Sequence, residues 1–216
     1  MAKVTFNTVI NDNELDKFLS MTEHHSGVRL PLAYAKNAKV VGAYVNGHLA
    51  GGYMLVTRPE FRTLMFVPDR CKRWNPFVEN SPYDMLEVNA LWVGPAIKTP
   101  RMQLRFWTAL VFDIFFARKH YLLLMSNAKN RTIQYIHQMT NPTIIYEGAP
   151  QLPSGYSSHA EIRVAYTTRW SIMLNFPRYL SEIHSRNMRI RAARQAKRQQ
   201  ASQGASAKPG GALTHA

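Results

Sequence analysis

Cysteine is almost absent from this chain, and acidic residues are scarce. The single cysteine, Cys71, cannot form a disulfide within the chain, and a zinc site built on cysteine ligands would need partners that are missing. We therefore expect a reducing compartment and no metal. The 216 residues hold 13 Asp and Glu against 27 Lys and Arg, a formal net charge of +14. This excess of positive charge favours anionic partners.

Long hydrophobic runs are also missing. The most apolar stretch, Phe106–Phe116, contains Asp113 and is far shorter than the roughly 20 residues that cross a membrane. The first residues lack the apolar segment of a secretory signal. We expect no membrane span and a cytoplasmic protein. Hydrophobic residues still make up 46% of the chain, so a folded core is expected and a wholly disordered chain is excluded.

Helix and strand patterns alternate along the first 170 residues. Asn46-Gly47 separates two β-prone runs and is a pair that type I′ hairpin turns favour. Met85–Val93 has the apolar content of a central strand, and residues 102–120 repeat apolar side chains at helical spacing. Further helices are predicted at 13–24 and 131–139, and strands at 121–125, 143–148 and 160–170. This order predicts an α/β (α+β) fold and excludes a helix bundle or β-sandwich.

The composition changes at Pro177. We expect one domain over residues 1–176, followed at 177–216 by a basic helix and a flexible, low-complexity tail. In 177–216, eight Lys and Arg face a single acid, Glu182. Residues 186–208 could contact nucleic acid or another anionic assembly without sequence preference, because clustered cations release counterions from phosphates. The alternative is a solvated tail that aids solubility.

The end of the predicted central strand carries a family resemblance. Leu91-Trp92-Val93-Gly94-Pro95-Ala96-Ile97-Lys98 is similar to the L-x-V-x-P-A-x-[Q/R] segment of the GNAT (GCN5-related N-acetyltransferase) superfamily. The resemblance extends over about Asn13 to Trp170. It implies a single mixed, mostly antiparallel sheet flanked by helices, and an acyltransferase that uses a thioester donor. The family segment continues with glycines where this chain has Arg101 and Gln103.

The resemblance implies that the donor binds around this loop. The family's glycines let backbone N–H groups approach the pyrophosphate of acetyl-coenzyme A. Arg101 and Gln103 do not permit that approach, whereas Lys98 and Arg101 can supply charge to a phosphate. Three alternatives stay open: an acyl-coenzyme A site rebuilt from side chains, a site for the phosphopantetheine of an acidic acyl carrier protein, or no donor site. In the first two, backbone groups of Leu91–Val93 would hold the pantetheine arm.

Two catalytic candidates follow from the same resemblance. The family usually places a base on or near this strand and a tyrosine acid on a later helix, positions that Glu87 and Tyr135 hold here. Glu87 and Asn89 should share a strand face, because side chains repeat every two residues. Tyr135 lies in a segment beginning at Asn127 that resembles the family's N-x-x-[A]-x-x-[L]-Y run with one extra residue. This makes Asn127 a donor-binding candidate. The alternatives are a paired strand carboxylate and a core tyrosine.

The sequence therefore predicts an N-acyltransferase that moves an acyl group from acyl-coenzyme A or an acyl carrier protein to a primary amine. Nothing in the sequence indicates which amine. The alternative is a GNAT-like structural or interaction module without catalysis, anchored by its basic tail. Such a module could be a viral particle component or a nucleic-acid-associated protein. The histidines at 24, 25 and 120 have no metal-ligand spacing with carboxylates.

Overall fold

The computed structural model describes residues 3–73, 83–129, 131–151 and 160–182 and, beyond these, the helical positions 185, 188, 192 and 195. The chain divides into two compact units, residues 1–177 and 178–216. No helix in the described part is long and apolar enough to cross a membrane. The expected anion-binding segment, residues 186–208, lies outside the described residues except at positions 188, 192 and 195. Its role stays a prediction.

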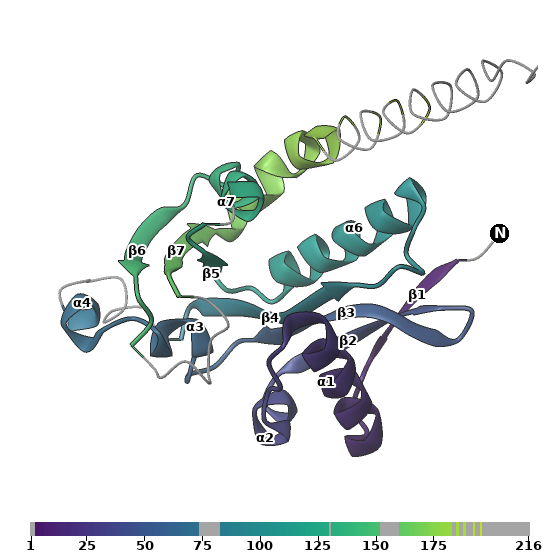
Figure 1. Ribbon diagram of the computed structural model, residues 1–216, viewed down its shortest axis with the longest axis horizontal. Helices are drawn as coiled ribbons and strands as arrows, with labels where there is room; N and C mark the ends of the chain where they lie inside the picture. The colour runs from purple at the N-terminus through teal and green to yellow at the C-terminus, as the bar shows by residue number, and fades with distance from the viewer. Residues whose placement is uncertain are drawn as a thin grey trace, which may run out of the picture. The chain divides into compact units, whose positions relative to one another are not determined.

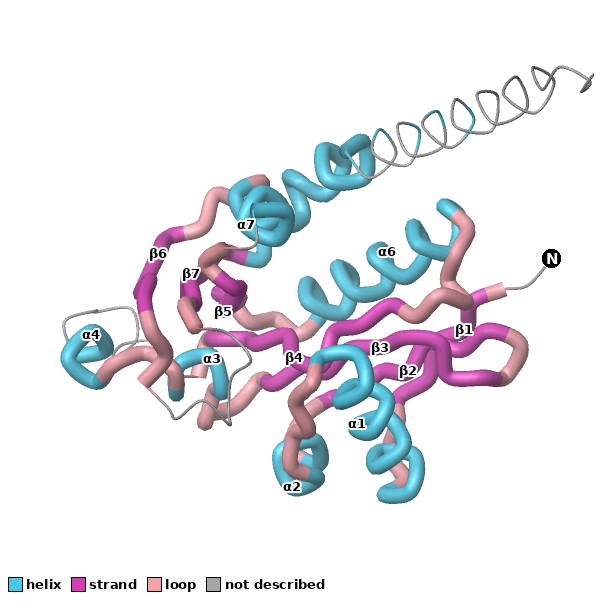
Figure 2. Tube along the Cα trace, viewed as in Figure 1, coloured by secondary structure: helices cyan, strands magenta, loops and turns pink. Residues whose placement is uncertain are grey.

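Seven strands of the first unit form one sheet in the order β1-β2-β3-β4-β5-β7-β6 (Figures 1 and 2). The strands are β1 (Val4–Thr8), β2 (Lys39–Val45), β3 (His48–Val56), β4 (Met85–Val93), β5 (Tyr121–Asn127), β6 (Thr143–Gly148) and β7 (Ile162–Thr168). The helices are α1 (Asp12–Ser26), α2 (Leu32–Lys36), α3 (Arg62–Met65), α4 (Asp69–Arg73), α6 (Pro100–Phe116) and α7 (Arg131–Gln138).

The sheet is mixed and mostly antiparallel. Only β4 and β5 run parallel, and every other neighbouring pair is antiparallel. Helix α6 covers one face of the sheet, and α1 and α2 cover the other (Figure 1). Phe106 of α6 packs against Tyr53 of β3, with ring centroids 5.9 Å apart. Phe18 of α1 packs in the other core with Met54. The predicted fold class, one such sheet flanked by helices, is confirmed.

Local sequence signals predicted several elements well. Asn46 and Gly47 both have positive φ, 51° and 79°, as a type I′ turn requires. The predicted central strand is β4, with the same bounds. Helix α6 begins after Thr99, whose hydroxyl accepts the Met102 N–H at 3.2 Å, and Pro100 occupies its first turn.

Other elements differ from the sequence prediction. Strand β1 was not predicted, and neither were the short helices α2, α3 and α4. The strand predicted at 160–170 ends at Thr168, and residues 169–182 are helical. Ile172 buries its side chain in the core cluster that contains Phe106. This segment therefore packs through one apolar helix face instead of extending the sheet.

Gly52 of β3 lies directly against α1. A Cβ at this position would lie 2.5 Å from the Phe18 ring and 2.5 Å from the carbonyl oxygen of Val41. Real Cβ atoms do not approach other atoms so closely, so either α1 or the β2–β3 pair would have to move. The glycine is thus required by packing between the helix and the sheet.

We expect Gly52→Ala to lower the free energy of unfolding by about 3 kcal/mol, because overpacking displaces backbone as well as a side chain. Urea unfolding measures the loss. Gly27→Ala is the matched control: Gly27 has φ 73° and no atom within 4 Å of an added Cβ. That variant should lose only about 1 kcal/mol, from the left-handed backbone conformation. An equal or smaller loss at Gly52 would contradict the packing argument.

Candidate functional site

Strands β4 and β5 separate part-way along their length. They pair in parallel only over Met85–Glu87 and Tyr121–Leu123, although both strands continue. Strand β5 keeps its other neighbour, β7, along its whole length. The remainder of β4, Val88–Val93, therefore has one backbone edge without a partner strand in the described part of the chain. An extended segment with amide groups could bind along this edge as an added strand would.

A bulge in β4 lies beside this opening. Asn89 and Trp92 are three residues apart, yet their partners on β3 are only two apart, and Ala90 between them has φ 49°. A bulge of this kind bends the strand and increases its twist. Asn89 contacts α2, while the Trp92 ring stacks on His25 of α1 with centroids 4.6 Å apart. Both side chains thus point to the same face of the sheet.

Glu87 is fully buried where the two strands part, with 0% of its surface exposed. Its Oε1 accepts hydrogen bonds from the Thr63 backbone N–H at 2.8 Å and from the Thr63 hydroxyl at 2.5 Å. Its Oε2 accepts the Tyr34 hydroxyl at 3.4 Å. Burial raises the pKa of Glu87, and hydrogen bonds from Thr63 and Asn89 oppose this rise only in part. Such a carboxyl can exchange its proton closer to neutral pH than an exposed one.

Tyr34 joins this buried carboxyl to a partly exposed position on α2. Its hydroxyl accepts hydrogen bonds from Asn89 Nδ2 at 3.0 Å and from the Arg62 backbone N–H at 3.4 Å. Burial, and after it the charge of Glu87, raise the pKa of Tyr34, so the hydroxyl keeps its proton and can donate. Tyr34, Thr63, Glu87 and Asn89 form one network, which we call the Glu87 network.

Two of the four network residues were predictable from the sequence. Glu87 and Asn89 point to the same face, as the strand alternation predicts. Tyr34 and Thr63 were missed, because each lies on a helix of four or five residues that the sequence pattern did not indicate. Only the folded chain brings these segments against β4.

The three β4 residues predicted to hold the donor lie along the unpaired edge. The side chains of Leu91 and Val93 are 42% and 36% exposed, whereas Trp92 is buried. The Trp92 indole N–H is buried without a hydrogen-bond partner in the described part of the chain. Val93 pairs with Gly51, the residue over which Phe106 of α6 packs. The donor-binding role of these residues stays a prediction, and their backbone positions fit it.

The loop between β4 and α6 does not provide the glycine-lined backbone of the family. Pro100 has no N–H, and the N–H groups of Met102 and Gln103 are taken by the side chain and carbonyl of Thr99. The Gln103 side chain donates to the Ile97 carbonyl at 3.4 Å, which stabilises the loop. The side chains of the loop can also offer charge to an anion. Lys98 and Arg101 are both exposed there and line a cavity of about 750 Å³.

Asn127 and Tyr135 lie on the other side of the opening. Asn127 ends β5, and its Oδ1 accepts the Lys129 backbone N–H at 2.8 Å, so it shapes the turn toward α7. Tyr135 lies on α7 and is 47% exposed. Among the described residues, Tyr135 forms no hydrogen bond with the Glu87 network. Its predicted role as an acid stays a prediction.

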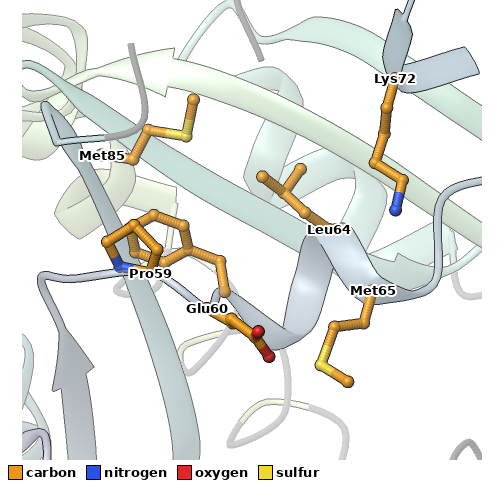
Figure 3. Close-up of a pocket in the computed structure, with 7 residues that line it drawn as sticks. Pro59, Glu60, Leu64, Met65, Lys72 and Met85 are labelled. Atoms are coloured by element: carbon orange, nitrogen blue, oxygen red, sulfur yellow. The ribbon is translucent and has the colours of Figure 1, made fainter. Parts of the chain in front are cut away.

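A smaller cavity, of about 250 Å³, is lined by neighbours in the chain of Thr63 and Glu87, and Figure 3 shows its lining residues. Met85, two residues before Glu87 on β4, forms one wall, and α3, which carries Thr63, forms another. The lining is mostly apolar, with one carboxylate and one ammonium group: Pro59, Glu60, Phe61, Leu64, Met65, Lys72 and Met85. This space suits a small group with an apolar body and a polar end.

No cluster of three or more His, Cys, Asp or Glu within the described ranges is placed to hold a metal ion. Glu87 and Tyr34 are placed to pass a proton between them, beside an edge that can bind an extended amide.

Comparison with known proteins gives a fold and no close relative. No protein-family model and no curated protein matches the sequence. FeeM, an N-acyl amino acid synthase from uncultured soil microbes, matches with a TM-score of 0.55 at 13% identity, over 78% of this chain and 92% of that one. The ribosomal-protein-S18-alanine N-acetyltransferase from Escherichia coli gives 0.50 at 9% identity, over 76% and 93%. The chain has a GNAT-like fold. At these identities the similarity between this chain and the two enzymes concerns the fold alone.

Glu87→Gln should remove a pH-dependent cost of burial. Glu87 has a higher pKa in the folded chain than in the unfolded chain. The protonated carboxyl therefore stabilises the folded chain at pH values below the unfolded-state pKa. This contribution is lost as the pH rises through the folded-state pKa. We expect the free energy of unfolding of Glu87→Gln, relative to the unmodified chain, to increase as pH rises above the ordinary glutamate pKa. Urea unfolding at several pH values measures this, with exposed Glu161→Gln as control. A difference that does not vary with pH would contradict it.

Proposed function

We propose that this protein is an N-acyltransferase that moves an acyl group from a thioester donor to a primary amine. One observation carries the proposal: within a GNAT-like fold, β4 and β5 part directly beside a buried carboxyl whose pKa is raised. The unpaired β4 edge offers N–H and C=O groups to an extended amide chain, which describes the pantetheine arm of acyl-coenzyme A or of an acyl carrier protein.

The reaction requires two proton movements. The amine nitrogen attacks the thioester carbonyl carbon, a C–N bond forms, and the C–S bond breaks. The amine gives up a proton to a base, and the leaving thiolate gains one from an acid. A protonated amine cannot attack, so the base decides how much reactive amine is present.

Glu87 is the proposed base, and Tyr34 is the proposed route to it. The carboxylate is fully buried, so the amine proton would reach it through the Tyr34 hydroxyl, which already donates to Glu87 Oε2. Asn89 fixes the orientation of that hydroxyl through a 3.0 Å hydrogen bond. Tyr135 on α7 is the proposed acid for the thiolate.

The remaining predicted residues concern the donor. Backbone groups of Leu91–Val93 would bind the pantetheine arm, and Lys98 and Arg101 would meet its phosphate. Gln103 and Asn127 would act indirectly, because their side chains hold the β4–α6 loop and the turn before α7. Both donor classes present the same arm to β4.

Acyl transfer can be tested with the purified chain, short- and long-chain acyl-coenzyme A, an acylated carrier protein and a mixture of primary amines. Release of free thiol together with a new amide, identified by mass spectrometry, is the expected result. No amide from any donor would contradict the proposal, and thiol release without an amide would indicate thioester hydrolysis instead.

Substitutions in the network should then separate the roles. Glu87→Gln should lower kcat by about 10²- to 10⁴-fold, the usual contribution of general base catalysis. Tyr34→Phe should also lower kcat and shift the pH profile, because the carboxyl loses one of its hydrogen-bond donors and the proposed proton route to the amine. Tyr83→Phe, at an exposed tyrosine outside the network, is the control and should leave kcat unchanged. Full activity of Tyr34→Phe would contradict transfer through Tyr34.

A further inference from the structure

Exposed apolar side chains gather where the end of α6 meets the helical residues that follow β7. The Phe115 ring joins the two segments, because its centroid lies 5.1 Å from that of Trp170 and 5.7 Å from that of Phe116. Phe112 stacks on Phe116 with centroids 6.0 Å apart. Leu174 follows Trp170 by four residues and shares its helix face. The exposed members of this group, which we call the aromatic face, are Phe112 (47% exposed), Phe116 (66%), Trp170 (50%) and Leu174 (77%).

The aromatic face is additional to the surface that the fold itself buries. Helix α6 already packs on the sheet through buried side chains such as Phe106 and Ile114. The residues after β7 pack in the same core through Ile172, with Met173 and Phe176 against it. Each helix therefore has one apolar side in the core and a second apolar side in solvent. An exposed apolar patch with a polar rim is typical of an interaction surface.

Arginines form the rim of the aromatic face. Arg105 lies two helical turns before the first phenylalanine of the face, on the same side of α6, and Arg118 follows the last one; both are exposed. The Arg169 guanidinium lies over the Phe115 and Trp170 rings, 5.6 and 5.7 Å from their centroids. None of the three arginines forms an ion pair with an acid in the described part of the chain.

Negative charge is scarce around the aromatic face. Asp113 is the only acid of α6, and its carboxylate is directed at the sheet, where it accepts hydrogen bonds from Lys39 Nζ at 2.7 Å and from the Tyr53 hydroxyl at 2.9 Å. Residues 169–177 contain no acid. The two segments therefore present apolar rings together with positive charge that no acid within them neutralises.

This charge selects among the partners that could cover the face. A second copy of the chain carries the same arginines and a net charge of +14, so a symmetric contact through the face would bring like charges together. The C-terminal residues 183–216 are basic and contain no acid, so the same repulsion applies to them. A bilayer with anionic lipids instead offers negative headgroups to the arginines and an apolar interior to the rings.

We propose that the aromatic face binds the surface of a bilayer that contains anionic lipids. Phe112, Phe116 and Trp170 insert at the boundary between headgroups and acyl chains, where aromatic side chains are favoured. Arg105, Arg118 and the other cations of the rim contact lipid phosphates, because a guanidinium group binds phosphate oxygens in pairs. The proposal does not depend on acyl transfer.

Sedimentation of the full chain with vesicles tests the proposal. Vesicles of equal parts phosphatidylcholine and phosphatidylglycerol should bind the chain at physiological salt, and vesicles of phosphatidylcholine alone should bind it more weakly. Phe112→Gln/Phe116→Gln should weaken binding to the anionic vesicles at least tenfold, because binding scales with the apolar area that is buried. Ile10→Gln/Ile144→Gln is the matched control, because it also removes two exposed apolar side chains and keeps the aromatic face. Its affinity should stay within twofold of the unmodified chain.

Three outcomes would overturn the proposal. One is the absence of binding to the anionic vesicles at millimolar lipid. Another is equal affinity of the two double variants, which would assign the binding to cations elsewhere in the chain, such as those of residues 186–208. The third is a dimer, detected by light scattering without lipid, that Phe112→Gln/Phe116→Gln dissociates, because the aromatic face would then belong to a second copy of the chain.

A second measurement reports which part of the chain enters the bilayer and does not remove any phenylalanine. Trp170 is the most exposed of the described tryptophans. Lipids with brominated acyl chains quench tryptophan fluorescence on contact, so the fluorescence of the unmodified chain should fall when it binds anionic vesicles made with them. Trp170→Phe keeps an aromatic ring, so it should still bind but lose most of this quenching. Undiminished quenching in Trp170→Phe would show that another segment enters the bilayer, and would overturn the proposal.

Discussion

The separation of β4 from β5 after Glu87 is the constraint on which the rest of the site depends. Parallel strands require a crossover connection, and here that connection contains the loop after β4 and all of α6. The bulge at Ala90 turns the free end of β4 away from the ladder that begins at Met85. Backbone groups on that edge lose their strand partner. A ligand with its own amides can pair with them as an added strand does, so the gap in the ladder favours binding of an extended chain.

The same separation explains why the Glu87 carboxyl accepts several hydrogen bonds. Glu87 is the last residue of β4 that pairs with β5, and it is fully buried. The next residue of β4 no longer pairs with β5. A charged carboxylate at this depth needs donors, and both atoms of Thr63 that can donate are directed at one of its oxygens. Thr63 in turn fixes α3 against β4, and α3 forms a wall of the smaller cavity. The hydrogen bonds from Thr63 to the buried Glu87 thereby position α3, which does not pair with any strand of the sheet.

How far the sequence predicts this arrangement depends on the range of the interactions. Asn46-Gly47 and β4 were predictable, because turn geometry and strand alternation are properties of a few neighbouring residues. The common face of Glu87 and Asn89 follows from the same alternation. Tyr34 and Thr63 were not predictable as members of the Glu87 network, because their positions depend on tertiary contacts with β4. Strand β1, which begins directly after Lys3, is a short edge strand with three exposed residues, and its pattern resembles that of a loop.

The start of α6 differs from a glycine-lined phosphate loop in the groups that it presents to a ligand. Glycine-lined loops bind phosphate with backbone N–H groups, which are fixed in place and cost little entropy on binding. In this chain Pro100 has no N–H, and Thr99 takes the N–H groups of Met102 and Gln103, so fewer donors of the helix start are available to a ligand. Charge for an anion would come from Lys98 and Arg101, whose long side chains would lose rotamer freedom on binding. Binding by such exposed side chains weakens more steeply with salt than binding by buried backbone dipoles, because mobile ions screen exposed charges first.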